Sequence, residues 1–521
     1  MIRNFRQSAI AMSIFATFST SFAGTQSVPP DDEIRKILAE RVGENETAIG
    51  IVVGVIDPQR QSGSDRQSGR RLAVESSDGR RIISYGHRNA GDARPLDGDT
   101  VFEIASVTKV FTALLLADMV EKKEVALSDP ASKYLIAAAT KLPERNGHVI
   151  TLVDLATHTS GLPFMPADAP PFNDPAAAKY STGDLKRYLA SYRLTRDIGS
   201  DWDYSNLGYW ILSEALAARA GKDIEDLIRS RVLAPLRMPD TDFKLSPKMK
   251  ENLAPGHDSA LQPAPAASTI PIYSIMLAGG GLYSTASDLL TFLSECMGYE
   301  PSPLAPAMKV ALSGRRPVQP GNEQALGWNV YRRDDDQVIF RDGGSFGYAS
   351  VMAYDPEARV GVVVLTNQVG DVGDIARHLL RPDFPLAKPA NTKHIEITLD
   401  PKILDSYVGR YEAKGEGVFT VARDQDFLTI ESPADWGLPK LRIRPESQRN
   451  FFATELPVRV TFQTGPDGKV TSLTIYPPRG QKGVPANKLP GEKYQQPHQE
   501  PLPIDEGWRD RVGEAAALAA P

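Results

Sequence analysis

The stretch VFEIASVTKVFTALLLADMV runs from Val101 to Val120 and holds the pair of residues on which the interpretation of the chain depends. Its second half, residues 111–120, is an apolar run that predicts a strong helix, and the charged residues 121–124 predict its end. Ser106 is the only serine in the chain with a lysine three positions later. Since residues three apart share one face of a helix, the Lys109 amine can reach the Ser106 hydroxyl.

The start of this helix favours a nucleophilic serine. Free N–H groups and partial positive charge at a helix N-terminus stabilise a negatively charged oxygen, and the Ser106 amide can supply one oxyanion donor. Lys109 must lose its proton to act as a base, which burial and cationic neighbours can cause. By itself a serine three positions before a lysine occurs about twice by chance in a chain of this length, so the pair needs independent support.

A second motif, Tyr204-Ser205-Asn206, supplies that support. Tyr204 is the only one of the 17 tyrosines with an asparagine two positions later. A tyrosine beside a lysine can exchange protons with a serine and with a leaving group. The amide of Asn206 can hold both a lysine and a substrate carbonyl. Taken alone, a tyrosine in a turn more often has a packing role.

A third motif is the glycine-containing segment from Arg341 to Tyr348, just before two strand-like runs within residues 350–366. Glycines at the edge of a strand allow a substrate backbone to approach closely. The alternative interpretation of the segment is a tight hairpin without any functional role.

The three motifs, in this order, resemble those of the serine β-lactamase and penicillin-binding-protein superfamily. The resemblance is to its class C branch, which includes class C β-lactamases, D-alanyl-D-alanine carboxypeptidases and the β-lactamase-like family VIII esterases. It covers about residues 31–385. Three further stretches are similar to the family: residues 102–105 before the serine, His158-Thr159-Ser160-Gly161-Leu162, and residues 279–285.

The resemblance implies a role for each matching residue. Ser106 would be the acylated nucleophile, Lys109 its base partner, and Tyr204 a second general base that passes a proton to the leaving group. The amides of Ser106 and Gly344 would form the oxyanion hole. Asn206, Arg341 and Gly343 would complete the substrate-binding site. Neither a metal ion nor a cofactor is expected.

The third motif departs from the family pattern. The family has Lys-Thr-Gly or His-x-Gly where this chain has Arg341-Asp342-Gly343. An arginine can hold a substrate carboxylate with two parallel hydrogen bonds. Asp342, however, adds a negative charge where a hydroxyl is usual. The motif therefore leaves open whether the protein recognises the carboxylate of a β-lactam or a D-alanyl peptide.

Two other nucleophile arrangements are disfavoured. Residues 343–347 satisfy the G-x-S-x-G pattern around Ser345, but that pattern requires a preceding strand and a following helix, and the sequence that follows is strand-like. His158 could suggest a Ser-His-Asp triad, yet a Ser106–Lys109–Tyr204 site does not need it. We expect His158 to make hydrogen bonds within a turn.

The expected fold is α+β, with a β-lactamase/transpeptidase-like antiparallel sheet flanked by helices and a mainly helical subdomain. Local pairing of residues 50–56 with residues 81–85 favours antiparallel strands over βαβ units. Short alternating runs after residue 389, starting with residues 394–399, predict a small all-β, barrel-like domain. The predicted domains are residues 24–388 for the hydrolase, 389–478 for the β-domain and 479–521 for a loosely ordered tail.

Residues 1–23 read as a secretory signal peptide, with Arg3 and Arg6, an apolar stretch and the small-x-small pattern Ser21-Phe22-Ala23. A single cysteine, Cys296, rules out an internal disulfide, which suits a bacterial periplasm. The net charge of −6 without a basic stripe argues against nucleic-acid binding. We expect a periplasmic or secreted protein with no stable membrane span once the signal is cleaved.

These observations predict an exported serine hydrolase that cleaves an amide, either a β-lactam or a D-Ala-type peptide, through an acyl-enzyme on Ser106. The expected partner is a small-molecule or peptidoglycan-derived substrate. Two alternatives stay open: a β-lactamase-like carboxylesterase on small acyl esters, and a non-catalytic penicillin- or peptidoglycan-binding protein. The sequence does not indicate the oligomeric state.

Overall fold

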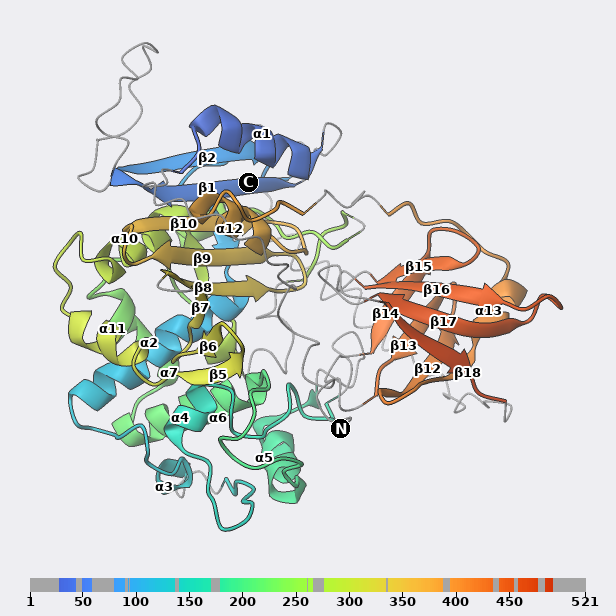
Figure 1. The fold of residues 1–521 in the computed structure, drawn as a ribbon, viewed down its shortest axis with the longest axis horizontal. Coiled ribbons are helices and arrows are strands. Elements are labelled where there is room, and N and C mark those ends of the chain that lie inside the picture. The colour runs from blue at the N-terminus through green and yellow to red at the C-terminus, as the bar shows by residue number, and fades with distance from the viewer. Residues whose placement is uncertain are drawn as a thin grey trace, which may run out of the picture.

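The computed structural model describes residues 28–43, 49–58, 79–89, 92, 94–135, 140–169, 179–259, 261–265, 276–333, 336–387, 394–433, 440–453, 458–476 and 483–490. They form a mixed α/β body up to residue 387 and an all-β body from residue 394 (Figure 1). The predicted signal peptide, residues 1–23, lies outside the described residues. No helix among the described residues is long and apolar enough to cross a membrane.

An antiparallel sheet of eight strands is the centre of the first body, as the sequence predicted. The strand order is β2-β1-β10-β9-β8-β7-β6-β5, and every neighbouring pair is antiparallel. The strands are β1 (Gly50–Ile56), β2 (Arg80–Gly86), β5 (Arg316–Gln319), β6 (Asn322–Gln324), β7 (Asn329–Arg333), β8 (Asp336–Gly344), β9 (Ala349–Asp355) and β10 (Val360–Thr366).

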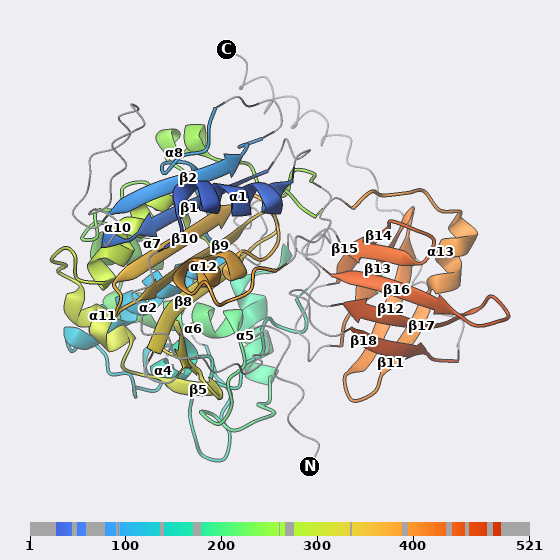
Figure 2. The ribbon, with the colours of Figure 1, turned by 45° about the horizontal axis from the view of Figure 1, so that its top comes forward.

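Helices cover both faces of this sheet (Figure 2). Successive residues of β1 point to opposite faces, so Val53 packs in a core with α1 and α12, whereas Val52 packs in a second core with α2 and α10. The central strands β1, β9 and β10 are therefore buried on both faces along their whole length. This explains why residues 50–56 and 360–366 are continuous apolar runs instead of alternating ones.

The helices of the first body divide between the sheet and a helical subdomain, in which α3 to α6 gather at one end of the sheet (Figure 1). Helix α2 is buried on almost every side, as expected of a helix at the centre of a domain. The helices are α1 (Asp31–Val42), α2 (Thr108–Glu121), α3 (Ser132–Leu135), α4 (Leu152–Ala156), α5 (Thr182–Ser191), α6 (Asn206–Ala220), α7 (Ile224–Ile228), α8 (Pro247–Asn252), α10 (Ala286–Cys296), α11 (Ala305–Ala311) and α12 (Gly373–Leu380).

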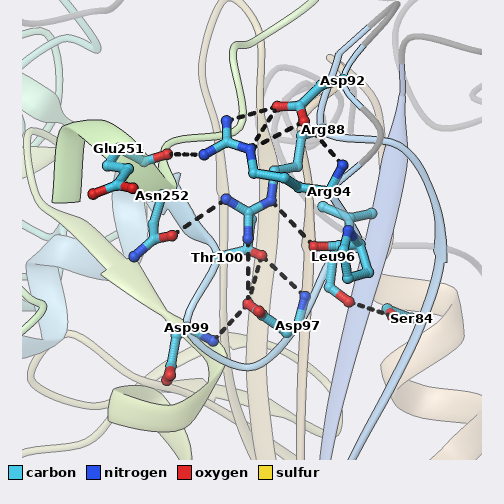
Figure 3. A network of polar contacts seen from close by, with 11 residues as sticks. Ser84, Arg88, Asp92, Arg94, Leu96, Asp97, Asp99, Thr100, Glu251 and Asn252 are labelled. Atoms are coloured by element: carbon cyan, nitrogen blue, oxygen red, sulfur yellow. Dashed lines mark hydrogen bonds and ion pairs between the residues drawn. The ribbon is translucent and has the colours of Figure 1, made fainter. Parts of the chain in front are cut away.

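A polar network fixes the segment that leads toward Ser106 (Figure 3). The guanidinium of Arg88 is buried and donates to the Pro95 carbonyl at 3.2 Å and to Asn252 Oδ1, in α8, at 3.3 Å. Arg88 also lies 3.6 Å from the carboxylate of Asp97, which accepts a 2.8 Å hydrogen bond from the Thr100 hydroxyl. Thr100 directly precedes β3 (Val101–Glu103), which pairs with β4 (Tyr283–Thr285). The network therefore anchors the start of the strand that carries the chain to Ser106.

The second body is a closed eight-stranded barrel, in line with the all-β domain predicted from the sequence. It has its own core of aromatic and aliphatic side chains, and α13 packs against it. The elements are α13 (Pro401–Tyr407), β11 (Gly409–Ala413), β12 (Gly417–Asp424), β13 (Phe427–Glu431), β14 (Leu441–Pro445), β15 (Asn450–Ala453), β16 (Arg459–Thr464), β17 (Val470–Tyr476) and β18 (Val484–Lys488).

Two details of the barrel differ from the sequence-based expectation. Strand β18 closes the barrel against β11, although the predicted boundary at residue 478 falls before it. Its only buried side chain is Ala486, so no alternating apolar pattern marks the strand. Residues 394–399, predicted as a strand, form none, because Ile395 and Ile397 are exposed and only the Ile397 amide bonds to β14, at Pro445.

The barrel contacts the first body through a loop that also borders β8 and β9. The Ser259 hydroxyl donates to the carbonyl of Ala453, in β15, at 2.6 Å, and both residues are buried. Earlier in the same loop, the carbonyl of Ala254 accepts a 2.9 Å hydrogen bond from the Tyr348 hydroxyl, at the turn between β8 and β9. The barrel therefore touches the segment that frames the third motif.

Candidate active site

Ser106 lies in a short 3₁₀ turn, Ala105–Val107, that continues directly into α2. The preceding residue, Ala105, has a φ of 45°, in the left-handed region that residues with a Cβ seldom adopt. Two contacts hold the turn: the Ile104 amide donates to the Leu282 carbonyl at 2.9 Å, and the Ser350 hydroxyl donates to the Ile104 carbonyl at 2.8 Å. Backbone strain held in place by its surroundings is typical of functional sites.

Lys109 is fully buried, and its side-chain nitrogen, Nζ, reaches three oxygens. It donates to Ser106 Oγ at 3.2 Å, to Asn206 Oδ1 at 2.8 Å and to the carbonyl of Gly279. The Ser106–Lys109 contact that the helical spacing predicted is therefore present. The sequence analysis did not predict the contact of Lys109 with the Gly279 carbonyl. Every residue has a backbone carbonyl, so only the small residues around Gly279 could have indicated a close approach there.

The environment of Lys109 favours its neutral form. Burial is the main cause that holds the pKa of Lys109 well below its usual value, and the nearby guanidinium of Arg341 lowers it further. The carboxylate of Asp342 acts in the opposite direction. A lysine that is neutral at moderate pH can accept the proton of a serine hydroxyl.

Tyr204 faces the serine from the other side. Its hydroxyl donates to Ser106 Oγ at 2.6 Å and accepts a 2.8 Å hydrogen bond from the guanidinium of Arg341. Burial raises the pKa of Tyr204, and the charge of Arg341 counteracts this effect. Ser106 therefore has two buried ionisable side chains within hydrogen-bond distance.

The Asn206 amide is positioned by the start of α6. Ser205 caps the helix, since its hydroxyl accepts from the Gly208 amide at 2.8 Å. The first helical residue, Asn206, is thereby directed at Lys109. The structure brings all three residues of the second motif to the site, but Ser205 acts through the helix cap and not through Ser106.

Gly343 and Gly344 end strand β8 next to Ser106. The pairing of β7 with β8 stops at Asn329 and Phe340, so β7 does not cover this edge of β8 beyond Phe340. A Cβ placed on Gly343 would lie 2.8 Å from the Ser106 amide nitrogen and 2.5 Å from the Ile104 carbonyl, whereas one on Gly344 would meet no atom within 4 Å. Gly343 therefore permits close packing against the serine turn, and Gly344 borders open space.

Arg341 does not lie where a substrate clamp was expected. Its side chain is 2% exposed, and the guanidinium donates to the Tyr204 hydroxyl and, at 3.2 Å, to the Ser106 carbonyl. Side chains alternate along β8, so Asp342 lies on the opposite face, with its strand partner Val351 in the core under α1 and α12. The charge of the aspartate nevertheless acts on the site, since it raises the pKa of Lys109.

The segment after β8 is a hairpin turn as well as a border of the site. The Ser345 amide donates to the Tyr348 carbonyl at 3.0 Å, and β9 follows directly. Because a strand and not a helix follows, Ser345 does not occupy a nucleophile elbow. Among the described residues, no group of three or more His, Cys, Asp or Glu side chains is arranged to hold a metal ion.

Comparison with known proteins places this site in a family. The family model "Beta-lactamase" matches residues 56–382, more than half of the chain, and "Domain of unknown function (DUF3471)" matches residues 393–487. The D-alanyl-D-alanine-carboxypeptidase/endopeptidase AmpH of Escherichia coli is 31% identical over 317 residues, which cover 58% of this chain and 80% of AmpH. Penicillin-binding protein 4* of Bacillus subtilis is 26% identical over 441 residues, covering 78% and 92% of the two chains.

Solved structures share the fold. A class C β-lactamase from Rhodobacter sphaeroides superposes with a TM-score of 0.54 at 22% identity, over 68% of this chain and 98% of that one. A β-lactamase/D-alanine carboxypeptidase from Yersinia pestis gives 0.52 at 24% identity, over 65% and 92%. The fold, the site and the matches together define a serine hydrolase. The chain belongs to the β-lactamase family, within the serine β-lactamase and penicillin-binding-protein superfamily that its motifs resemble.

Proposed function

We propose that the protein cleaves an amide or ester bond through an acyl-enzyme on Ser106. The observation that carries this proposal is the position of Ser106 Oγ, which lies 3.2 Å from Lys109 Nζ and 2.6 Å from the Tyr204 hydroxyl. Both partners are buried, so their protonation states are set by neighbouring groups and not by bulk water.

In the acylation step, Ser106 Oγ forms a bond to the carbonyl carbon of the substrate. Its proton passes to the neutral amine of Lys109, and the negative charge moves onto the carbonyl oxygen. The amides of Ser106 and Gly344 donate to that oxygen, and two such donors supply much of the stabilisation in acyl transfer. The bond to the leaving group then breaks, and the leaving nitrogen or oxygen takes a proton from Tyr204.

Deacylation repeats these steps with water as the nucleophile. Tyr204, which gave its proton to the leaving group, accepts the water proton, and the ester oxygen of Ser106 regains a proton from Lys109 as the acid product leaves. Asn206 and the Gly279 carbonyl hold Lys109 through both steps, so that its nitrogen stays directed at Ser106 Oγ. Arg341 holds the Tyr204 hydroxyl.

The preferred substrates are amides: β-lactams or D-Ala-type peptides. Support comes from the relatives, whose names include a D-alanyl-D-alanine-carboxypeptidase/endopeptidase and a penicillin-binding protein. It also comes from the end of β8, where β7 no longer covers the edge, since an extended backbone can add to such an edge by main-chain hydrogen bonds.

A second candidate activity, hydrolysis of small acyl esters, is favoured by Arg341. Its buried guanidinium is already committed to the Tyr204 hydroxyl and the Ser106 carbonyl, so it offers little to a substrate carboxylate. A site without that cationic clamp suits an uncharged acyl ester better than an anionic β-lactam.

Parallel assays with nitrocefin and p-nitrophenyl butyrate separate the two candidates. Intact-mass spectrometry after incubation with a penicillin and with a fluorophosphonate shows whether an adduct forms and whether it decays, and peptide mapping locates it. We expect an adduct on Ser106 that Ser106→Ala abolishes. Ester turnover without β-lactam turnover or acylation would overturn the amide preference, and an adduct on another serine would overturn the mechanism.

Export to the bacterial periplasm or medium is part of the proposal. It is supported by the signal-like residues 1–23 and by the nature of peptidoglycan-derived substrates, which lie outside the cytoplasm. Expression of the full chain in a bacterial host, followed by N-terminal sequencing of the periplasmic fraction, tests it. A mature protein beginning after Ala23 is expected, and an unprocessed chain confined to the cytoplasm would contradict it.

A further inference from the structure

His158 accepts hydrogen bonds from the backbone on both sides of Tyr204. Its carbonyl accepts a hydrogen bond from the Asp203 amide at 2.8 Å, and its side-chain Nδ1 accepts one from the Ser205 amide at 3.1 Å. The chain makes this possible at His158 by adopting a φ of 59°, in the left-handed region. Carbonyl and ring therefore face the same neighbouring segment.

The ring of His158 also supports the Tyr204 ring directly. Their centroids are 4.4 Å apart with an interplanar angle of 37°, and the Tyr209 ring lies at 5.2 Å on α6. The side chain is 1% exposed. One residue therefore fixes both the main chain and the ring of the tyrosine whose hydroxyl touches Ser106.

This support matters because Tyr204 lies outside any helix or strand. Residues 202–205 have no regular secondary structure, and α6 begins only at Asn206. The segment instead lies along residues 158–164 and is held there by backbone hydrogen bonds. Besides the two His158 contacts, the Gly199 amide donates to the Thr159 carbonyl at 2.8 Å. The Asn206 amide donates to the Phe164 carbonyl at 3.0 Å. Of these contacts, those of His158 are the ones adjacent to Tyr204.

The hydrogen bond from Ser205 determines the tautomer. Because Nδ1 accepts from an amide, the neutral ring carries its proton on Nε2. Nε2 is buried and has no hydrogen-bond partner among the described residues, so its proton is not needed by a protein acceptor. Burial, followed by the positive charge of Arg341, holds the pKa of His158 well below its usual value. The imidazole therefore stays neutral and keeps Nδ1 free to accept.

We propose that His158 is a positioning residue for Tyr204: its Nδ1 and carbonyl hold the Ser205 and Asp203 amides, and its ring fixes the tyrosine hydroxyl at Ser106 Oγ. This inference rests on the proposed function, since it assigns His158 a part in proton exchange by Tyr204. It is distinct from a Ser-His-Asp arrangement, because the side-chain acceptor of His158 is occupied by the main chain of Ser205.

Two substitutions of similar size separate positioning from general stability. His158→Asn keeps a side-chain acceptor at the place of Nδ1, and asparagine tolerates the left-handed backbone. His158→Gln moves the acceptor to the place of Nε2. We expect His158→Gln to lower kcat about 100-fold with little change in KM, because a displacement of about 1 Å can cost that much. His158→Asn should keep kcat within about tenfold of the wild type.

The assays use the full chain, with the folded fraction of each variant measured by near-ultraviolet circular dichroism so that kcat refers to folded enzyme. Equal loss in both variants, or wild-type kcat in both, would overturn the inference. Nitrogen-15 NMR of the histidine-labelled wild type gives a second check, because it reports the tautomer of His158 in the unsubstituted protein. We expect a neutral His158 with the proton on Nε2, its signal assigned by its absence from His158→Asn.

A proton on Nδ1 would overturn the inference even if the enzyme is active. Conversely, wild-type protein that hydrolyses neither nitrocefin nor p-nitrophenyl butyrate and forms no adduct on Ser106 would refute the proposed function. The NMR result would still report the contact between His158 and Ser205. The two failures are thus distinguishable.

Discussion

The Tyr204 hydroxyl and Ser106 Oγ are 2.6 Å apart, although 98 positions separate the two residues in the chain. Lys109, one helical turn from Ser106, reaches the same oxygen at 3.2 Å. The local pair is a product of helical spacing, whereas the tyrosine is delivered by a separate, irregular segment. The arrangement gives one serine two proton partners whose pKa values are shifted in opposite directions by burial, Lys109 downward and Tyr204 upward.

Removal of the nucleophile should abolish acyl-enzyme formation. We expect Ser106→Ala to show no adduct with a fluorophosphonate. We expect Tyr204→Phe to lower kcat about 10²- to 10⁴-fold, which is the usual range for the loss of a proton-transfer group. Ser345→Ala is the matched control, since Ser345 lies in the turn after β8 and not at a nucleophile elbow. Intact-mass spectrometry and steady-state assays measure both effects. An adduct that persists in Ser106→Ala would contradict the assignment.

Charges at positions 341 and 342 should move the pH profile in opposite directions. In the proposed mechanism Lys109 accepts a proton as a neutral amine, so activity should rise as the pH passes upward through the pKa of Lys109. Beyond the main effect of burial, Arg341 lowers that pKa and Asp342 raises it. Arg341→Gln should therefore shift the acidic limb of kcat/KM to higher pH, and Asp342→Asn should shift it to lower pH.

Arg341→Lys is the control for this pair, because it keeps the positive charge while losing the planar guanidinium. Its acidic limb should remain near that of the wild type, even if kcat falls. Thermal unfolding of each variant verifies that the proteins are folded across the pH range. Shifts of the same sign in Arg341→Gln and Asp342→Asn would show that local charge does not control Lys109.

The two adjacent glycines of the third motif should respond very differently to a methyl group. In Gly343→Ala the new Cβ would lie 2.5 Å from the Ile104 carbonyl and 2.8 Å from the Ser106 amide, so the backbone of the serine turn must move. We expect a loss of about 1–3 kcal/mol in the free energy of unfolding and about a 100-fold loss of kcat. Gly344→Ala meets no atom within 4 Å and should unfold like the wild type.

Urea unfolding and steady-state kinetics measure this contrast. Equal stability of the two alanine variants would mean that the close approach of β8 to the serine turn is not required in solution.

The sequence was sufficient for the motifs whose meaning is local. The lysine three residues after Ser106 reaches it because helical spacing is fixed. The sequence likewise predicted a strand at residues 50–56, which form β1. Such features depend on neighbours within a few residues, which a sequence displays directly.

Features that depend on distant packing were not predictable. The sequence shows that Arg341 and Gly343 share one face of a strand, but not that this face is buried against Tyr204. The Gly279 carbonyl, 170 positions from Lys109, is a backbone group without a residue signature. Strand β18 buries only Ala486, so its place in the barrel follows from closure of the sheet and not from its own apolar pattern.

The barrel should fold without the hydrolase body. Its core is formed entirely by residues between Leu399 and Ala486, and none of them belongs to either core of the first body. A closed barrel also leaves no strand edge to pair with another sheet. We expect residues 391–490 to unfold cooperatively in urea with a free energy of about 5–10 kcal/mol.

A chain ending at residue 388 should still acylate Ser106 with kcat within a few-fold of the full protein, because every contact described for Ser106, Lys109 and Tyr204 comes from residues before 345. Circular dichroism of the isolated barrel and mass spectrometry of the shortened chain measure the two halves separately. Loss of acylation in a well-folded shortened chain would show instead that the contact between Ser259 and Ala453 holds the loop beside β8 in its active position.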